Sequence, residues 1–345
     1  MTGGGIEIGL NAAIVAVEGD DPLVLATGRD GSEGDALPFG PFDPIRHRTL
    51  EIGLRSWVSA QTTLTIGYVE QLYTFGDRGR LARAGDSGPH VVSVGYLALT
   101  RPTPAAAPAL AASGAAFRPW YGYFPWEDWR GGRPALIDAV ILPALRAWAA
   151  AGPDPGSARS RPPLDATHLT ETEVREIHSG TGALGRRERL RLFFGDGGSP
   201  WDEEKVLERY ELLYEAALVE EALRDGRQPV GPVAAPLGLT MRFDHRRILA
   251  TAISRLRAKL KYRPVVFELM PEAFTLTDLQ RTVEAISGRH LHKQNFRRLV
   301  EQGALVEPTG ETSNETGGRP AQLFRFRRDV LQERPAPGLR LGTRG

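Results

Sequence analysis

A short segment near the C-terminal end of the chain, "HKQNFRRLVEQG" (292–303), carries residue types that bind nucleic acid. At roughly 100° per residue, Phe296, Leu299 and Val300 fall on one arc of a helix. The opposite arc carries long basic and amide side chains, namely Lys293, Gln294, Arg297 and Arg298. Side chains of this kind read guanine and adenine edges or clamp phosphates in the major groove. The segment is therefore predicted to be a recognition helix with a buried face and a DNA-reading face.

The neighbouring segments have the order of a winged helix-turn-helix. Two segments with helical apolar periodicity precede the recognition helix, and Asp244 and either Thr275 or Thr277 can cap them. The second of these helices is expected to end at Gly288. The predicted elements are, in chain order, helices at 245–262, 275–288 and 293–303 and strands at 304–308 and 321–328. Three helices followed by a β-hairpin are typical of a winged helix domain.

The loop between the two strands, "TGETSNETGGRP" (309–320), corresponds to the wing, whose Arg319 can enter a minor groove. Arg325 alternates with Phe324 and Phe326, so it is expected to face away from the core. The predicted DNA contacts are Lys293, Gln294, Asn295, Arg297, Arg298, Arg319, Arg325 and Thr277. A solvated basic helix in a module that binds another protein is the alternative interpretation of the same pattern.

The charge of the chain is unevenly distributed. The formal net charge is +1, but residues 241–345 contain 20 Lys/Arg and 11 Asp/Glu, a balance of +9. The residues before them carry the compensating excess of acid. A basic module joined to an acidic one indicates a polyanionic partner for the C-terminal part, with surface variation of no functional meaning as the alternative.

Composition excludes several kinds of site. The 345 residues suit two domains, and the absence of cysteine excludes disulfides, thiolate metal sites and Cys nucleophiles. The first ten residues lack the basic and apolar regions of a signal peptide. The most apolar stretch, 135–152, is interrupted by Asp138, Pro143 and Arg146, so no membrane span is expected. A cytoplasmic location without membrane contact is predicted.

The first 150 residues are predicted to form an α/β (α+β) unit. Runs with β-branched and aromatic enrichment occur at 9–19, 22–28, 64–75 and 91–100. The first two are joined by the turn "EGDDP". One helix is expected at about 47–61 and another at about 133–151, kinked or restarted at Pro143. Strands with interspersed helices are typical of this fold class.

The middle of the chain reads as a linker followed by a helix. Residues 151–166 are rich in Pro, Gly and Ser. Residues 199–226 are expected to form one strong helix, with Ser199 as its cap and Pro200 in its first turn. The apolar stripe of this helix is expected to be intramolecular core, and it consists of Val206, Tyr210, Leu213 and Ala217.

Several segments resemble a known family, the Nudix-related transcriptional regulators of NAD metabolism (NrtR/NadQ type). Their winged helix domain is resembled by "KLKYRPVVFELMPEAFTLTDLQRTVEAISG", "KQNFRRLVEQGALVEP" and "GRPAQLFRF". Their Nudix-like domain is resembled by "EQLYTFGDRGR" and "VVSVGYLAL". The longer NadQ-type branch is resembled by "LPFGPFDPIRHRTLE", "YFPWEDWR" and "WDEEKVLERYELLYEAALVEEA". The resemblance covers most of the chain.

The resemblance implies an N-terminal Nudix-like α/β/α sandwich with a mixed sheet and a C-terminal winged helix-turn-helix. The predicted division has four parts: a Nudix-like ligand-sensing domain at 1–150, a linker and acidic connecting helix at 151–240, a winged helix DNA-binding domain at 241–330, and a disordered tail at 331–345.

The helix at about 47–61 stands where active Nudix hydrolases carry their catalytic segment, G-x5-E-x7-R-E-U-x-E-E-x-G-U, with U aliphatic. The glutamates of that segment hold Mg²⁺. Here Trp57 stands at the first glutamate of the helix, and Ala60 and Gln61 stand at the final pair. Glu51 alone does not make a multi-carboxylate site, so no catalytic residue, no metal site and no hydrolysis are predicted. A divergent hydrolase acting on ADP-ribose or a related nucleotide is the alternative.

The resemblance also implies that the domain senses NAD, ADP-ribose or another adenine nucleotide and requires no cofactor. The candidate ligand residues are Arg46, Arg48, Gln71, Tyr73, Phe75, Asp77 and Trp126, with Trp120, Tyr121 and Trp129 as further aromatic candidates. The arginines suit a diphosphate, the aromatics suit an adenine, and the amide and carboxylate suit a ribose or base. A position in the core is the alternative for each aromatic residue.

Together these features predict a transcriptional regulator, a repressor of NAD biosynthesis or salvage genes that binds a palindromic operator as a homodimer. The nucleotide would bind one dimer arrangement better than another and so change the affinity for DNA.

Overall fold

The computed structural model describes residues 6–28, 34–62, 64, 66–76, 90–151, 184–231, 236–313, 320–333 and 338–339. Its strands are β1 (Ile6–Glu18), β2 (Asp21–Thr27), β3 (Phe39–Pro41), β4 (Val69–Phe75), β5 (His90–Leu99), β6 (Ala115–Pro119), β7 (Val306–Ser313) and β8 (Ala321–Phe326). Its α-helices are α1 (Leu50–Thr62), α2 (Ala107–Ala112), α3 (Leu142–Ala151), α5 (Arg186–Phe194), α6 (Val206–Glu215), α7 (Glu220–Arg224), α8 (His245–Tyr262), α9 (Leu276–Ser287), α10 (Lys293–Gly303) and α11 (Val330–Glu333). Short 3₁₀ turns are η1 (Pro104–Ala106), η2 (Trp120–Gly122), η5 (Asp196–Gly198) and η6 (Val265–Glu268), and η3 (Ile137–Ile141) is a π turn.

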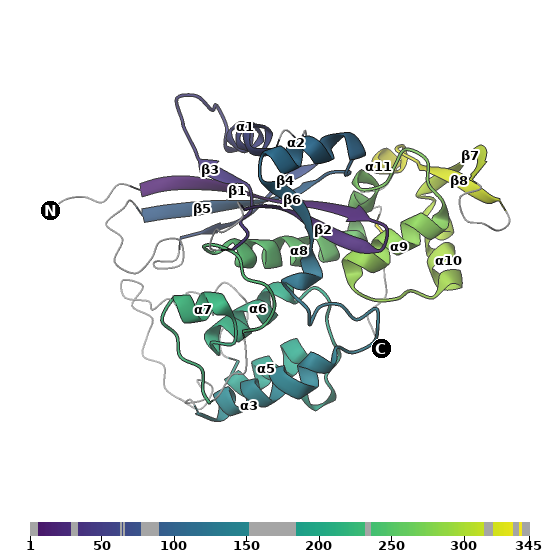
Figure 1. Ribbon diagram of the computed structural model, residues 1–345. Helices are drawn as coiled ribbons and strands as arrows, with labels where there is room; N and C mark the ends of the chain where they lie inside the picture. The colour runs from purple at the N-terminus through teal and green to yellow at the C-terminus, as the bar shows by residue number, and fades with distance from the viewer. Residues whose placement is uncertain are drawn as a thin grey trace.

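A mixed sheet lies at the centre of the molecule (Figure 1). The strand order is β4-β5-β1-β2-β6, and β3 pairs with part of β1. β1 runs parallel to β5, whereas the other paired strands of this sheet are antiparallel. β1 and β2 form the predicted hairpin, whose turn contains Gly19 with a φ of +60°. A positive φ of this kind favours glycine.

Helices cover both faces of the sheet, so the predicted α/β/α sandwich is confirmed. On one face, α1 buries Leu54 and Val58 against residues of β1 and β5. On the other face, α8 packs against β1, β4 and β5. The approach of α8 is close at Gly95, where an added Cβ would lie 3.1 Å from the Ile248 side chain. The burial of each such aliphatic side chain contributes about 1.5–3 kcal/mol.

The middle of the chain forms a separate helical layer from α3, α5, α6 and α7, below the sheet in Figure 1. The restart predicted at Pro143 is confirmed, because the π turn η3 passes into α3 at that point. Proline lacks the N–H that a continuous helix needs, which explains the irregular turn. The linker predicted at 151–166 lies almost entirely outside the described residues.

The prediction of one helix over 199–226 was wrong. Ser199 is extended and caps nothing, α6 begins only at Val206, and the chain leaves the helix at Ala217, whose φ is +56°. A left-handed alanine costs about 1–2 kcal/mol and ends a helix, so α7 has to start again at Glu220. The apolar stripe is buried as predicted, since Val206, Tyr210, Leu213 and Ala217 are each at most 1% exposed.

The C-terminal part has the predicted elements α8, α9, α10, β7 and β8 in the predicted order. Thr275 and Asp278 form a reciprocal capping box at the start of α9, and Gly288 ends that helix with a φ of +70°. Asp244 stands at the N-cap of α8, but its side chain makes no capping hydrogen bond and pairs with Arg247 at 3.1 Å. Backbone hydrogen bonds between Phe274 and Phe324 form an isolated antiparallel bridge to the hairpin.

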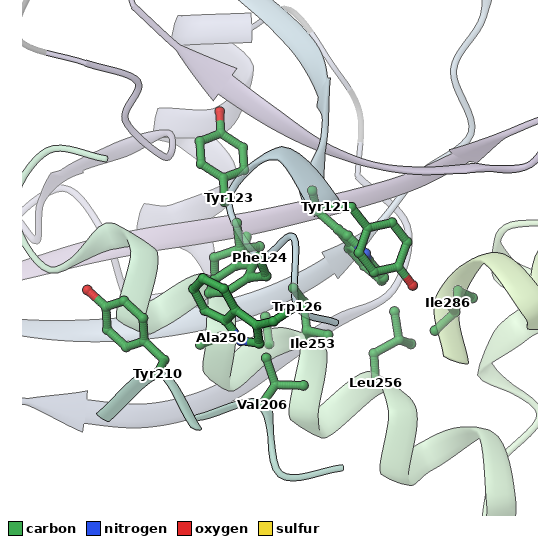
Figure 2. Close-up of a cluster of buried hydrophobic side chains, with 14 of the residues drawn as sticks. Tyr121, Tyr123, Phe124, Trp126, Val206, Tyr210, Ala250, Ile253, Leu256 and Ile286 are labelled. Atoms are coloured by element: carbon green, nitrogen blue, oxygen red, sulfur yellow. The ribbon is translucent and has the colours of Figure 1, made fainter. Parts of the chain in front are cut away.

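One continuous core joins the sheet, the helical layer and the winged helix. Figure 2 shows aromatic residues of the segment after β6 packed against α6, α8 and α9. The labelled members are Tyr121, Tyr123, Phe124, Trp126, Val206, Tyr210, Ala250, Ile253, Leu256 and Ile286. α8 is the central element of this core, because it contacts the sheet, α6 and α9. Within the described ranges, no helix is long and apolar enough to span a membrane.

Candidate nucleic-acid interface and nucleotide site

The helix α10 has the two faces that the sequence predicts. Phe296 and Val300 are buried against the winged helix core, and Leu299 is half-buried. The five predicted contact residues on this helix are all exposed: Lys293, Gln294, Asn295, Arg297 and Arg298. None of them forms an ion pair or a side-chain hydrogen bond with another residue that the structure describes. Their donors are therefore not committed to described parts of the protein.

The turn before α10 is held by side chains of α9. Glu284 accepts a 2.7 Å hydrogen bond from the backbone N–H of Leu291, and Gln280 donates a 2.8 Å hydrogen bond to the Leu291 carbonyl. Nδ1 of His290 lies 3.3 Å from the carboxylate of the same glutamate. These bonds fix the angle between α9 and α10, which determines how deeply a recognition helix enters a groove.

The wing is only partly described. Arg325 of β8 is exposed as predicted, and it pairs with Glu307 of β7 at 2.7 Å. Such an exposed pair contributes about 0–1 kcal/mol, so a phosphate can compete for the guanidinium. Arg319 lies outside the described residues, and Thr277 is half-buried in the first turn of α9.

In the Nudix-like domain, the residues that stand in the glutamate positions attach α1 to β3. The indole N–H of Trp57 donates a 2.7 Å hydrogen bond to the Pro41 carbonyl. Gln61 bonds both backbone groups of Phe39, at 3.2 Å and 2.6 Å. The Trp57 ring also lies directly over Gly40, where an added Cβ would overlap it. These side chains therefore have a structural role, and the volume beside the helix is occupied by an indole.

A small polar cluster lies under the N-terminal half of α1. The Tyr96 hydroxyl lies 3.5 Å from the Gln71 amide oxygen across the β4–β5 pair. Burial, and next the charge of Glu51, raise the pKa of Tyr96. Glu51 in turn pairs with Arg55 at 2.8 Å. This cluster contains one predicted residue, Gln71, and adds Tyr96, which the sequence did not single out.

The basic junction before α1 is exposed. Arg46 pairs with Asp43 at 3.4 Å, and its side chain is 83% exposed. Arg48 is also exposed. Backbone hydrogen bonds from Ile45 and Arg46 lower the pKa of Asp43, so this loop is closed by a carboxylate that is ionised at neutral pH. Both arginines remain candidates for an anionic group of a ligand.

The other predicted ligand residues are not brought together with this cluster. Phe75 and Trp126 are buried in the core, which corrects the expectation that their rings stack on an adenine. Trp126 packs edge-on against Phe124 and lies near the Arg246 guanidinium. Tyr73 is 55% exposed, but it lies near Arg255 of α8, on the opposite face of the sheet. Asp77 lies outside the described residues.

A buried charge cluster connects the helical layer to the winged helix. The Glu127 carboxylate accepts two hydrogen bonds from Arg209 of α6, at 2.6 Å and 2.9 Å, and one of 2.7 Å from Arg257 of α8. All three side chains are at most 2% exposed. Arg257 also donates to the Ile286 carbonyl in α9, at 2.9 Å. The cluster thus links the helices α6, α8 and α9 through the segment that carries Glu127.

Two further bonds join the segment after β6 to the end of α9. The Trp129 amide donates to the Gly288 carbonyl at 2.7 Å, and the Tyr121 hydroxyl donates to the Ala285 carbonyl at 2.7 Å. The space here is tight, because an added Cβ on Gly288 would lie 2.5 Å from the Glu127 carbonyl oxygen. Movement of this segment would therefore be transmitted to the helix-turn-helix.

A second connection links the loop before α1 to α8. The Leu37 amide donates a 3.0 Å hydrogen bond to Nδ1 of His245, the first residue of α8. Phe39 packs edge-on against the same imidazole, with the ring centroids 5.1 Å apart. Burial lowers the pKa of His245 to about 3, so the ring is neutral at physiological pH. A change at α1 and β3 would reach α8 through these contacts.

Sequence reasoning missed both connections. The "YFPWEDWR" segment had an unusual mixture of aromatic and charged residues, which was the available signal for the Glu127 cluster. His245 gave no such signal, because its partner Leu37 is more than two hundred residues away. In the part of the chain that the structure describes, no group of three or more His, Asp or Glu side chains is arranged to hold a metal ion.

Comparison with known proteins gives sequence matches to part of the chain and fold similarity over almost all of it. A family model described as the NrtR DNA-binding winged helix domain matches residues 266–326. The ADPR responsive transcriptional repressor NtrR of Acinetobacter baylyi is 44% identical over 90 residues, which are 26% of this chain and 36% of the relative. The chain thus matches about a third of the length of that curated relative.

The fold of almost the whole chain is similar to solved structures. The crystal structure of Shewanella oneidensis NrtR with a 27mer DNA has a TM-score of 0.51 at 19% identity, covering 94% of this chain and 95% of that one. A second crystal structure of Shewanella oneidensis NrtR has a TM-score of 0.50 at 18% identity, and it covers the same shares of the two chains. At these identities the similarity shows the fold. Residues 266–326 therefore match the NrtR DNA-binding winged helix domain, and the fold of almost the whole chain is similar to that of NrtR.

Proposed function

We propose that the protein is a DNA-binding transcriptional repressor that responds to ADP-ribose or a related adenine nucleotide through a Nudix-like domain without hydrolase activity. The observation that carries the DNA-binding part is α10, whose exposed face presents five polar side chains that bond to no side chain or ion-pair partner among the described residues: Lys293, Gln294, Asn295, Arg297 and Arg298. This face fits the major groove, where long donors distinguish bases. Arg319, Arg325 and Thr277 would add contacts to the backbone or minor groove.

The effector part of the proposal is supported by the polar cluster of Glu51, Gln71 and Tyr96 beside the exposed arginines of the 46–48 junction. Hydroxyl, amide and guanidinium groups are suited to a ribose and a diphosphate. The Acinetobacter baylyi relative, which is 44% identical over 90 residues, is described as an ADPR responsive transcriptional repressor. The target genes we propose are those of NAD biosynthesis or salvage, on the strength of the family resemblance.

The mechanism we propose is a shift between arrangements of a homodimer on a palindromic operator. A nucleotide under α1 would act on β3, which Trp57 and Gln61 attach to that helix. From there the Leu37–His245 contact leads to α8, and α8 leads to α9 through Arg257. Only a ligand with different affinities for the two arrangements can shift their populations.

The test is a titration of the full chain against DNA from its own upstream region and from NAD-biosynthesis promoters, with and without ADP-ribose. We expect saturable binding that weakens steeply with salt, because Lys and Arg displace counterions from phosphates. ADP-ribose should shift the affinity at fixed salt. Binding without salt dependence, or equal binding to all sequences, would favour the protein-contact module instead. Unchanged affinity with ADP-ribose, NAD and AMP would remove the effector part alone.

A further inference from the structure

A cavity of about 580 Å³ lies outside the Nudix-like site, between the segment after β6 and the loop after α5. This volume is within the range of roughly 300–1,000 Å³ that small-molecule sites occupy. The lining residues that matter here are Trp129, Arg133, Asp138, Arg146, Asp196 and Trp201. None of the proposed DNA contacts belongs to this set, and Trp129 is its one member among the aromatic candidates that the sequence analysis named for a nucleotide.

The cavity carries two ion pairs. Arg133 binds Asp138 through two hydrogen bonds of 2.8 Å and 3.0 Å, and Arg146 binds Asp196 at 2.5 Å. The hydrogen bonds from Arg133 and Arg146 lower the pKa of Asp138 and Asp196, so both carboxylates are ionised at neutral pH. These four side chains therefore add to a net charge of zero, and they present both signs of charge.

The cavity also has an aromatic wall. The rings of Trp129 and Trp201 lie 4.5 Å apart at 41°. Each indole already has a guanidinium near its ring: Arg133 lies 5.3 Å from the Trp129 centroid and Arg209 lies 3.9 Å from the Trp201 centroid. Indole faces attract cations through their electron-rich π system. If Arg133 turns towards an anion, a cationic ring can replace it over Trp129.

The loop on the far side of the cavity contains two consecutive glycines with positive φ values. Gly197 and Gly198 have φ values of +67° and +84°, and a Cβ on either would meet no atom within 4 Å. Conformation, and not crowding, is therefore what requires glycine at these two positions. Their N–H groups are engaged within the loop, because Gly198 donates to the Gly195 carbonyl at 3.3 Å and Gly197 hydrogen-bonds the Asp196 carboxylate.

We propose that this cavity binds a small zwitterion that has a planar cationic ring and a phosphate monoester. The phosphate would take Arg133 and Arg146, and the ring would take Asp138 and the Trp129 face. Such a ligand keeps both guanidinium groups paired and gives Asp138 a new counter-charge, while Asp196 retains its hydrogen bond from the Gly197 backbone. A simple anion would strand the two carboxylates beside itself, and like charges at that distance repel.

The position of the cavity suggests a regulatory effect, and this part rests on the proposed function. The backbone amide of Trp129 donates to the Gly288 carbonyl at the end of α9. A small space lined by Trp129, Trp201, Gly288 and Arg289 continues from the aromatic wall towards the turn before α10. A ligand against Trp129 would therefore stabilise one position of the helix-turn-helix.

The test uses calorimetric titration of the full chain without DNA, with nicotinamide mononucleotide as the probe. Its oxidised ring is a cation and its reduced ring is neutral, so the pair differs chiefly in ring charge. We expect the oxidised form to bind with a Kd below about 1 mM, and the reduced form to bind at least about tenfold more weakly. Arg146→Gln should weaken both forms, and Asp138→Asn should remove the preference for the oxidised ring. Arg187→Gln, an exposed arginine of α5 outside the cavity, should change neither.

Three outcomes would overturn the site: no heat from the oxidised form up to about 1 mM, equal binding of the two forms, or a loss of binding in Arg48→Gln but not in Arg146→Gln. The regulatory part is tested separately, by measuring the affinity for operator DNA with and without the oxidised form. An unchanged DNA affinity would refute the coupling and leave the site intact. If the chain binds no operator at all, the proposed function fails, and the calorimetry still decides the site.

Discussion

The backbone amide of Trp129 donates a 2.7 Å hydrogen bond to the carbonyl of Gly288, the residue that ends the second helix of the winged helix domain. This bond joins the segment after the central sheet to the helix-turn-helix. The buried Glu127 carboxylate lies beside it and holds Arg209 and Arg257.

Replacing Glu127 with Gln should destabilise the protein strongly. The substitution leaves two buried guanidinium groups without their counter-charge, which typically costs about 3–5 kcal/mol. Urea unfolding followed by circular dichroism measures the loss. The matched control is Glu208→Gln, because Glu208 pairs with Lys205 near the surface and should cost at most about 1 kcal/mol. Equal effects of the two variants would show that the buried cluster contributes little.

Replacing Gly288 with Ala should cost more than replacing Gly226 with Ala. Both glycines have positive φ values, +70° and +81°, so each alanine is strained by about 1–2 kcal/mol. A Cβ on Gly226 meets nothing within 4 Å, whereas a Cβ on Gly288 meets the Glu127 carbonyl at 2.5 Å. Overpacking adds about 1–3 kcal/mol at Gly288. Thermal unfolding of both variants gives the comparison, and a smaller loss for Gly288→Ala would contradict the described junction.

Replacing Arg297 with Ala should reduce operator affinity by about 1–3 kcal/mol if the guanidinium contacts a base. The exposed position of Arg297 on α10, opposite the buried Phe296 and Val300, gives the reason. Fluorescence anisotropy with labelled operator measures the change. Arg187→Ala on α5 serves as the control for loss of one positive charge elsewhere, and it should leave the affinity unchanged. Operator binding that is intact in Arg297→Ala removes this residue from the recognition set.

Stability should fall with acidity because of His245. Burial holds its pKa at about 3 in the folded protein, whereas the unfolded value is about 6.5. Above about pH 6.5, the imidazole is neutral in both states and does not reduce the free energy of unfolding. As the pH falls from about 6.5 towards 3, this free energy decreases by up to about 1.4 kcal/mol per pH unit, because only the unfolded chain binds the proton.

The variant His245→Asn tests this assignment. Its amide oxygen can accept the hydrogen bond from Leu37, as Nδ1 does, but it does not titrate. Between about pH 7 and pH 5, the unfolding free energy of the original protein should fall by about 2 kcal/mol more than that of the variant. Parallel pH profiles for the two proteins would show that His245 is not the group responsible.

ADP-ribose should not be hydrolysed. Trp57 and Gln61 bond the backbone of β3 at the positions where active Nudix enzymes have glutamates. Glu51, the acid on α1, is paired with Arg55. Incubation with Mg²⁺ and ADP-ribose, followed by chromatography for AMP, is the measurement, and an active Nudix hydrolase is the positive control. Robust release of AMP would support the alternative of a divergent hydrolase and would contradict a purely sensory domain.

Local patterns predicted the winged helix well because its signals are short-range. The capping box of Thr275 and Asp278, the C-terminal Gly288 and the two faces of α10 depend on residues within a turn or two of each other. The helical layer was harder to predict from the sequence. The break at Ala217 depends on packing by distant segments, and nothing in "YEAALVEE" signals a left-handed alanine.

The candidate sites show the same limit. The burial of Trp126 depends on α6 and α8, so the sequence alone could not decide between a core position and an adenine site for this ring. The cavity joins Trp129 to Trp201, which are far apart in the chain, and its arginines looked like ordinary surface residues. The predicted Gln71 meets Tyr96 because their strands pair, and this could be inferred only once the register of β4 and β5 was known.

The position of α8 has a consequence for building chimaeras of this protein. This helix stands first in the winged helix order, yet it covers one face of the central sheet and lies outside the segment that matches the DNA-binding family. A graft that exchanges everything from residue 241 onwards would also replace the helix that covers one face of the central sheet. A chimaera that exchanges only the segment proposed to bind DNA should therefore be joined after Tyr262. The recipient protein then keeps the α8 helix that packs against its own sheet.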